Sequence, residues 1–188
     1  MDPTGLSQST DRGRPGEPVP DELAAMYRSE FRFIFHSLRR LGIAPRDLED
    51  LTHDVFFTAY KRMGTYDRAR PLKPWLFGIA FRLAKDFRAL ARQGRELPES
   101  PDGPEPADER PLPDENAAAR QDRDLVMRAL QRIELSRRAV FVMHDLEGLP
   151  APEIAEALEI PLGTAYSRLR QARQEFAEAV YGLRGGAR

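Results

Sequence analysis

A proline-rich acidic stretch near the middle of the chain limits this sequence to two small folded units. Six of the sixteen prolines lie between Pro98 and Pro113, in a segment almost without large apolar residues. Such a segment cannot bury enough apolar surface to offset the conformational entropy that folding removes. We therefore expect a flexible acidic linker over residues 96–119, with folded domains over residues 21–95 and 120–184.

Charge is distributed in blocks that the net charge of −1 conceals. Residues 21–95 hold fifteen Lys and Arg against nine Asp and Glu, whereas residues 96–124 hold three Arg against ten acids. A basic N-terminal half followed by an acidic centre indicates that different segments meet different partners, one of them polyanionic.

Several classes of protein are excluded by composition. The chain has no cysteine, which excludes disulfides, thiolate zinc sites and cysteine nucleophiles and fits a reducing compartment. Residues 1–20 lack the apolar run of a signal or anchor and are expected to form a disordered tail. No later stretch reaches the roughly 20 apolar residues that a membrane helix needs, so we expect a cytoplasmic protein without membrane insertion.

The N-terminal half has the periodicity of helices. Apolar residues recur at spacings of three and four and predict a helix that ends at Gly42, a second from Asp47, and a third after Pro71 and Pro74. Val, Ile and Thr are too scattered to indicate strands. The expected fold is therefore all-α, with a helical bundle as the N-terminal domain.

The C-terminal half predicts a helix-turn-helix. Ser136 and Gly148 suit the N-cap and C-cap of a helix over residues 137–146, and a short helix over residues 152–158 precedes a tight turn and a longer helix from Thr164. The longer helix has a predicted buried stripe and a polar opposite face. The stripe consists of Ala165, Leu169, Ala172 and Phe176, and the polar face of Ser167, Arg170, Gln171 and Gln174.

Both halves carry side chains suited to nucleic acid. Arg, Gln and Ser on the longer helix can contact phosphates and base edges in a major groove, although a solvated helix in a small bundle has the same pattern. Residues 66–95 combine basic side chains with aromatic side chains, a mixture that suits binding to melted DNA. The alternative for that segment is that Trp75, Leu76 and Ile79 fill the core while the Arg residues face solvent.

Little in the sequence indicates catalysis. Asp50, His53 and Asp54 share one helical turn and could suggest a metal or acid–base site, but no second cluster of ligands completes it. His36 and His144 are isolated, and no Gly-rich phosphate loop or nucleophile elbow is present. We expect a protein that is not an enzyme and that needs no cofactor or metal.

Two segments resemble the extracytoplasmic-function (ECF) RNA polymerase sigma factors. Their second conserved region is similar to DLEDLTHDVFFTAYKRMGTYDRARPLKPWLFGIAFRLAKDFRALAR, and their fourth to ALQRIELSRRAVFVMHDLEGLPAPEIAEALEIPLGTAYSRLRQAR. The resemblance implies a promoter-specificity subunit that binds core polymerase, recognises the minus-ten and minus-thirty-five elements and helps to melt the promoter.

The resemblance also assigns roles by position. The residues implied to bind core polymerase, as an exposed apolar stripe flanked by carboxylates, are Asp50, Leu51, Asp54, Val55, Phe56 and Tyr60. Those implied to meet the minus-ten element are Arg68, Arg70, Lys73, Trp75, Arg82, Lys85, Asp86 and Arg88. Those implied to read the minus-thirty-five element are Thr164, Tyr166, Ser167, Arg168, Arg170 and Gln171.

The implied partners are core RNA polymerase, promoter DNA and an anti-sigma protein. On the polymerase, the contacts would be the clamp helices of the largest subunit and the flap of the second subunit, and the acidic linker either mimics RNA in the exit path or serves as a plain spacer. Two alternatives are a polymerase-independent helix-turn-helix regulator, whose N-terminal half would mediate dimerisation, and a helical adaptor that binds no nucleic acid.

Several positions depart from the family pattern, including a stretch over residues 66–74 that is richer in Pro than usual and Pro150 and Pro152 in place of a usual Ser-x-Glu entry. Arg82 stands where Asn is usual, and Glu159 where Gly commonly makes the turn. Tyr166 replaces a usual Lys or Arg, and Gln171 a usual Arg. A positive φ at Glu159 would cost on the order of 1 kcal/mol.

Overall fold

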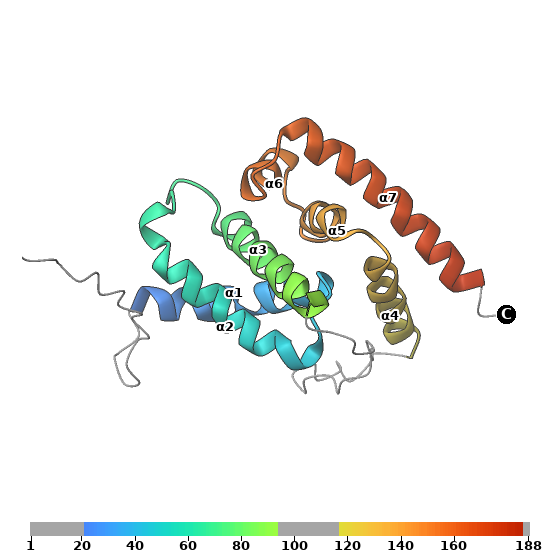
Figure 1. The fold of residues 1–188 in the computed structure, drawn as a ribbon, viewed down its shortest axis with the longest axis horizontal. Helices are drawn as coiled ribbons and strands as arrows, with labels where there is room; N and C mark the ends of the chain where they lie inside the picture. Colours follow the sequence, from blue (N-terminus) through green and yellow to red (C-terminus); the bar gives the residue numbers. More distant parts are fainter. Residues whose placement is uncertain (1–20, 94–116, 186–188) are drawn as a thin grey trace, which may run out of the picture.

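A computed structural model describes residues 21–93 and 117–185, and all regular elements within these ranges are helices (Figure 1). The elements in chain order are α1 (Asp21–Arg40), α2 (Pro45–Lys61), η1 (Met63–Thr65), α3 (Leu72–Gln93), α4 (Ala117–Gln131), α5 (Leu135–Phe141), η2 (Val142–Leu146), α6 (Ala151–Ala157) and α7 (Leu162–Gly185). The all-α prediction is confirmed. The predicted tail and residues 96–116 of the predicted linker lie outside the described residues, and the last three residues of that linker, 117–119, belong to α4.

Helices α1, α2 and α3 pack against one another through the apolar stripes that the sequence predicts. Ile34 and Leu38 of α1, Val55 of α2 and Leu76 of α3 are fully buried. Gly42 ends the α1 segment with a φ of +89°, a left-handed conformation that glycine adopts without the Cβ penalty. This turn lets α2 return antiparallel along α1.

The second group of helices departs from the prediction at α5. The N-cap is Glu134, whose carboxylate accepts hydrogen bonds from the backbone N–H groups of Ser136 and Arg137, so the prediction of Ser136 as the cap is wrong. Burial alone would raise the pKa of the Glu134 carboxyl, but these hydrogen bonds outweigh it and lower that pKa. The helix then widens into one π-helical turn, η2, before Gly148 turns the chain with a φ of +72°.

The short helix α6 and the long helix α7 form the predicted helix-turn-helix. Helix α7 begins at Leu162, two residues before its predicted start. Glu159, in the turn, has a φ of 55°. The positive φ that the sequence analysis considered at this position is therefore present. An L-residue with a side chain loses about 1 kcal/mol in this conformation, so the turn stores local strain.

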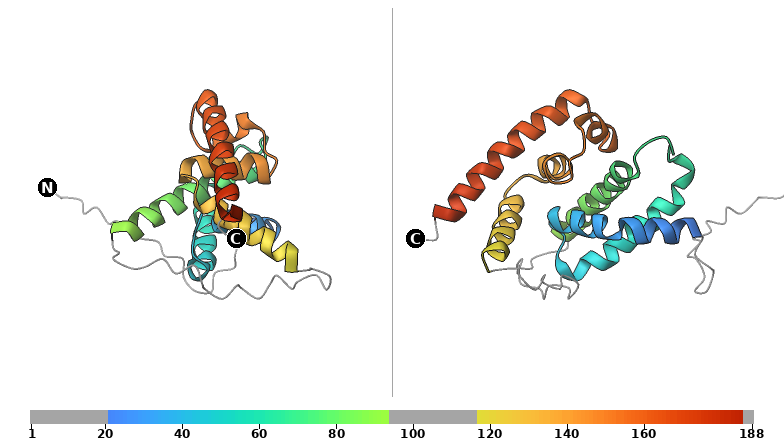
Figure 2. Two further views of the ribbon diagram at one scale, coloured as in Figure 1. Left: turned by 90° about the vertical axis from the view of Figure 1, so that its right-hand side faces the viewer. Right: turned by 180° about the vertical axis from the view of Figure 1, so that it is seen from behind.

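The two groups of helices share one continuous core. The buried apolar cluster runs from Ile34 and Leu76 in the first group to Val140 and Ile154 in the second. Helix α6 lies against α3, and α7 runs along the outer edge of the molecule (Figures 1 and 2). None of the helices in the described ranges combines the length and apolarity needed to cross a bilayer.

Candidate nucleic-acid interface

The N-terminal half of α7 presents a polar surface. Ala165, Leu169 and Ala172 are buried against the neighbouring helices, which confirms three positions of the predicted stripe, and Phe176 is half-buried. Tyr166, Ser167, Arg170 and Gln171 are exposed, whereas Thr164 and Arg168 are half-buried. Four of the six residues expected to read the minus-thirty-five element therefore lie open to solvent on one helix.

Two ion pairs fix α7 against the preceding segment. Arg173 donates to both carboxylate oxygens of Asp145, from Nε at 2.8 Å and from Nη2 at 2.6 Å, and Arg137 lies 2.9 Å from Glu175. The paired guanidinium of Arg173, together with the His144 ring, lowers the pKa of the Asp145 carboxyl. A bidentate pair of this kind restricts rotation, so it holds the exposed face of α7 in a fixed orientation.

The loop before α3 is held by its own side chains. The Tyr66 hydroxyl donates to the carbonyl of Arg70 at 2.6 Å, and Asp67 accepts from the backbone N–H of Ala69 at 3.0 Å and from Nε of Arg70 at 3.1 Å. The Tyr66 and Trp75 rings pack with centroids 4.8 Å apart. Trp75 is half-buried and packs against the core, which agrees in part with the core role considered for it.

The residues predicted to meet the minus-ten element are only partly brought together. Arg82, Lys85 and Asp86 of α3 are at least partly exposed, and Arg68, Arg70 and Lys73 are exposed in and after the loop. Arg88 instead reaches the turn after α1, where it donates to the carbonyl of Gly42 at 2.9 Å. Its guanidinium therefore joins α3 to α1.

Helix α6 lies on the part of α3 that carries Arg82. Nη1 of Arg82 donates to Glu159 at 3.0 Å and approaches the carbonyl of Ala157 at 3.4 Å. Arg70 pairs with Glu156 of α6. Two of the predicted minus-ten residues are thus engaged by carboxylates of the helix-turn-helix.

The exposed apolar stripe expected on α2 is wrong for three of its residues. Leu51, Val55 and Phe56 are 5%, 0% and 2% exposed, because this stripe packs into the core. The outward face of α2 instead carries Asp50, His53, Asp54, Phe57 and Tyr60. Phe57, which the sequence analysis missed, is 46% exposed, and the ammonium of Lys61 lies 4.1 Å from its ring centroid.

An apolar hollow of about 370 Å³ adjoins this face of α2. Leu23, Tyr27 and Phe57 contribute to its lining, and the Tyr27 hydroxyl forms a 2.9 Å hydrogen bond with His53 Nε2. Burial and the neighbouring Glu49 raise the pKa of Tyr27, which keeps the phenol protonated. In residues 21–93 and 117–185 no group of three or more His, Cys, Asp or Glu is placed to hold a metal ion.

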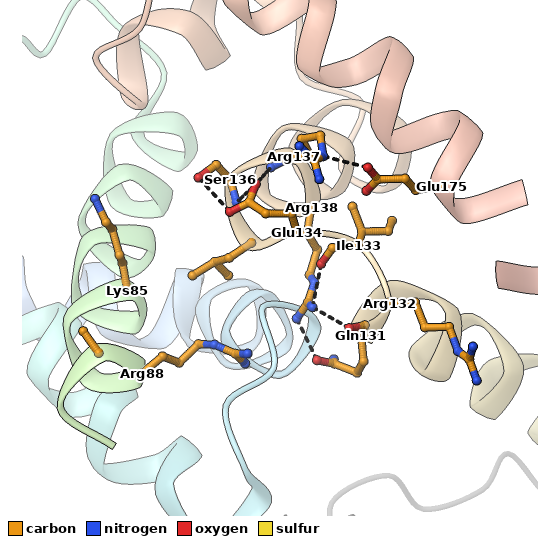
Figure 3. A pocket seen from close by; sticks show the side chains of 12 residues that line it. Lys85, Arg88, Gln131, Arg132, Ile133, Glu134, Ser136, Arg137, Arg138 and Glu175 are labelled. Carbon is orange, nitrogen blue, oxygen red and sulfur yellow. Dashed lines mark hydrogen bonds and ion pairs between the residues drawn. The ribbon is translucent and has the colours of Figure 1, made fainter. Parts of the chain in front are cut away.

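A second cavity, of about 540 Å³, lies in the seam between the two groups of helices (Figure 3). Lys85 and Arg88 line it from α3, and Arg137 and Arg138 line it from α5. Arg138 is 2% exposed and donates to Leu41 O at 2.9 Å, to Gln131 Oε1 at 2.7 Å, and to two further carbonyls of its own half. Arg138 therefore joins the two groups of helices, and Arg88 joins α3 to the turn after α1.

Two known families match this chain, one on each side of the predicted linker. Residues 26–96 match the family described as Sigma-70 region 2, and residues 123–176 match Sigma-70, region 4. The chain is 27% identical over 145 residues to the RNA polymerase sigma factor NccH of Alcaligenes xylosoxydans xylosoxydans, covering 76% of this chain and 77% of that protein. It is also 27% identical over 146 residues to the ECF RNA polymerase sigma-E factor of Escherichia coli strain K12, covering 73% and 75%.

Two solved structures share the fold. One is CnrH in complex with the cytosolic domain of CnrY, with a TM-score of 0.63 and 21% identity over 87% of this chain and 90% of that chain. The other is the sigma factor RpoE in complex with the anti-sigma factor NepR from Bartonella quintana, with a TM-score of 0.60 and 22% identity over 82% and 96%. Both structures support the all-α fold of this chain.

Proposed function

Because this chain belongs to the extracytoplasmic-function RNA polymerase sigma factors, we propose that three of its surfaces divide the work of promoter recognition. The outward face of α2 docks on core polymerase, the loop at residues 66–71 with α3 meets the minus-ten element, and α7 reads the minus-thirty-five element. The domain that carries the first two functions spans residues 21–95, and the domain that carries the third spans residues 120–184.

The observation that carries the proposal is the polar face of α7. Ser167, Arg170 and Gln171 stand on the exposed side of a helix whose opposite side is fixed in a core and clamped by Asp145. A helix held in this way can enter a major groove N-terminal end first, where Arg contacts guanine or phosphate and Gln contacts adenine.

The minus-ten surface combines cations with aromatic rings. Arg68, Lys73 and Lys85 are exposed and can follow phosphates, while Tyr66 and Trp75 form a partly exposed aromatic pair beside the loop. Melting needs no catalysis in this proposal. A base that leaves the stack and binds in a pocket offsets the unstacking cost, which is a few kcal/mol.

The docking surface is revised from the sequence expectation. Asp50, Asp54 and Tyr60 remain candidates, and Phe57 takes the place of the buried Phe56. Two carboxylates flanking exposed aromatic rings suit a partner helix that bears Arg, as expected for the clamp helices. Leu51 and Val55 act behind this face by fixing α2 in the core.

An anti-sigma protein is a further proposed partner. Both similar structures are complexes, one of CnrH with the cytosolic domain of CnrY and the other of RpoE with the anti-sigma factor NepR. The hollow beside α2 offers this chain an apolar recess for such a partner. Since its targets are polymerase and promoter DNA, we place the protein in the cytoplasm.

The test replaces the outward face of α2 without touching the core. The variant Asp50→Ala, Asp54→Ala, Phe57→Ala should lose co-migration with purified core polymerase on a native gel while its circular dichroism stays unchanged. A matched control, Asp122→Ala, Asp124→Ala, Tyr181→Ala, removes two exposed carboxylates and one exposed ring elsewhere and should bind normally. Equal binding by both variants would contradict the docking assignment.

A further inference from the structure

We propose that in the free chain α6 and the turn after it act as an internal acidic cover of part of the minus-ten surface, with the carboxylates of Glu156 and Glu159 in the place of DNA phosphates. The inference rests on the proposed minus-ten role of α3. It adds that the two promoter-binding parts of this chain hold each other closed until polymerase separates them.

Helix α6 approaches α3 closely at Gly78. A Cβ built on Gly78 would lie 2.4 Å from the carbonyl oxygen of Ala157, a distance that no real Cβ contact allows. Backbone of α6 therefore rests directly on backbone of α3, and the absence of a side chain at residue 78 makes this possible. Gly78 is buried, so solvent does not separate the helices here.

Two carboxylates flank this contact and pair with cations of the minus-ten surface. Glu159 accepts from Arg82 at 3.0 Å, and Glu156 pairs with Arg70. Each carboxylate supplies the negative oxygen that a phosphate would supply to the same guanidinium. Such exposed pairs change an equilibrium by no more than about fivefold each, so they select the orientation of α6 rather than hold it alone.

The far end of the seam supplies the remaining attachment. Buried Arg138 of α5 donates to the carbonyl of Leu41 at the end of α1, across 97 residues of sequence, and Arg40 pairs with Glu147. Arg138 keeps three acceptors within its own half, Gln131 Oε1 and the carbonyls of Gln131 and Ile133, and these three hydrogen bonds would survive separation. The seam can therefore open without leaving a buried charge unpartnered.

The closed arrangement engages Arg70 and Arg82 of the minus-ten surface and leaves the other two functional surfaces accessible. Asp50, Asp54 and Phe57 on α2 are exposed, and so are Arg170 and Gln171 on α7. Polymerase can dock on α2 while α6 still occupies the part of α3 around Gly78 and Arg82. The order of events that follows is docking first, separation second and contact with the minus-ten element last.

The first test is Gly78→Ala in the full chain. Alanine favours the helix that contains residue 78, so a misfolded α3 is not the expected result, but its Cβ must displace α6. Gly182→Ala is the matched control, because Gly182 also lies in a helix and a Cβ there meets nothing within 4 Å. The chain has no native cysteine, so spin labels on Arg46→Cys and Tyr181→Cys report the separation directly.

The cover predicts one narrow distance distribution for wild type and for Gly182→Ala, and a longer, broader one for Gly78→Ala. A labelled pool of random single-stranded 12-mers should bind Gly78→Ala about five- to tenfold more tightly than wild type at low salt. An unchanged distance distribution would overturn the closed arrangement, and a longer distance with unchanged DNA binding would overturn the cover.

A charge exchange tests the acidic mimic. Glu159→Arg should lengthen the label distance by placing two cations together, and Arg82→Glu with Glu159→Arg should restore the wild-type distance. Failure of the double variant to restore it would contradict the role of this pair. Promoter-dependent transcription with core polymerase tests the proposed function separately, because it requires the three binding surfaces whether or not the free chain is closed.

Discussion

At the scale of single residues, the ionic contacts that matter most are those with fixed geometry. Asp145 is 21% exposed in its side chain and receives two hydrogen bonds from one guanidinium, whereas Arg46 and Asp47 make a more exposed contact at 3.6 Å. Bidentate geometry adds energy and direction, while loose surface pairs add almost none. Asp145 thus links the π-helical turn to the helix that we assign to DNA reading.

Asp145→Asn should lower the free energy of unfolding by about 1 kcal/mol at pH 7. The folded state lowers the pKa of this carboxyl, so its contribution is present above the ordinary carboxyl pKa of about 3.9 and disappears as pH falls through the lower folded value. Urea unfolding of both proteins from pH 7 to pH 3 should show the difference narrowing below about pH 4. Asp122→Asn, an exposed control in α4, should change little at any pH.

At the scale of elements, sequence periodicity identified the helices but not always their roles. The stripe of Leu51, Val55 and Phe56 was visible in the sequence, yet periodicity does not say whether a stripe faces the core or a partner. The cap of α5 was missed for a different reason. Ser is a common N-cap and Glu is not, so local preference favoured Ser136, while the side chain of Glu134 makes the bonds.

Adjacent phenylalanines on α2 should therefore behave differently. Phe56→Ala removes a buried ring and should destabilise the fold by about 3–5 kcal/mol, as measured by urea unfolding. Phe57→Ala should cost less than about 1 kcal/mol in stability but weaken the complex with core polymerase. If Phe57→Ala bound polymerase normally while Phe56→Ala remained folded but unbound, the revised docking face would be incorrect.

On α7, Arg170→Ala and Gln171→Ala should each reduce minus-thirty-five discrimination by about 1–3 kcal/mol, because both side chains are exposed on the proposed reading face. Transcription from a promoter library measures this as a change in preferred sequence. Arg184→Ala, near the exposed C-terminal end of the same helix, is the control and should leave the preference intact. An unchanged preference in all three variants would rule out base reading by this face.

At the scale of the whole molecule, the two halves were predictable and the seam between them was not. Apolar periodicity and the acidic linker predicted two groups of helices. The seam depends on backbone carbonyls of Leu41 and Ala157, which any residue would offer, and on the position of Arg138, which is 97 residues from its acceptor. No local pattern encodes such contacts, although the lack of a side chain at Gly78 was a signal in retrospect.

Gly42→Ala should test how much the seam between the two groups of helices contributes to stability. Its left-handed φ costs an alanine about 1 kcal/mol, and the added Cβ would also meet polar atoms of Arg88, Gln131 and Arg138 at 2.4–2.7 Å. We expect a total loss of about 2 kcal/mol in urea unfolding, because those hydrogen bonds must rearrange. Gly148→Ala has a similar φ but open space around it, so it should lose only about 1 kcal/mol. Equal losses would show that the seam tolerates crowding.

The contact between Arg82 and Glu159 has an evolutionary consequence. Both residues depart from the pattern that the resemblance to the ECF sigma factors implies, and their side chains contact each other. Relatives with Lys or Arg at the position of Arg82 should therefore tend to carry Asp or Glu at the position of Glu159. Relatives with Asn at the position of Arg82 should be free to keep Gly in the turn. This covariation would mark the relatives in which carboxylates of one half of the chain mimic DNA phosphates for the other half.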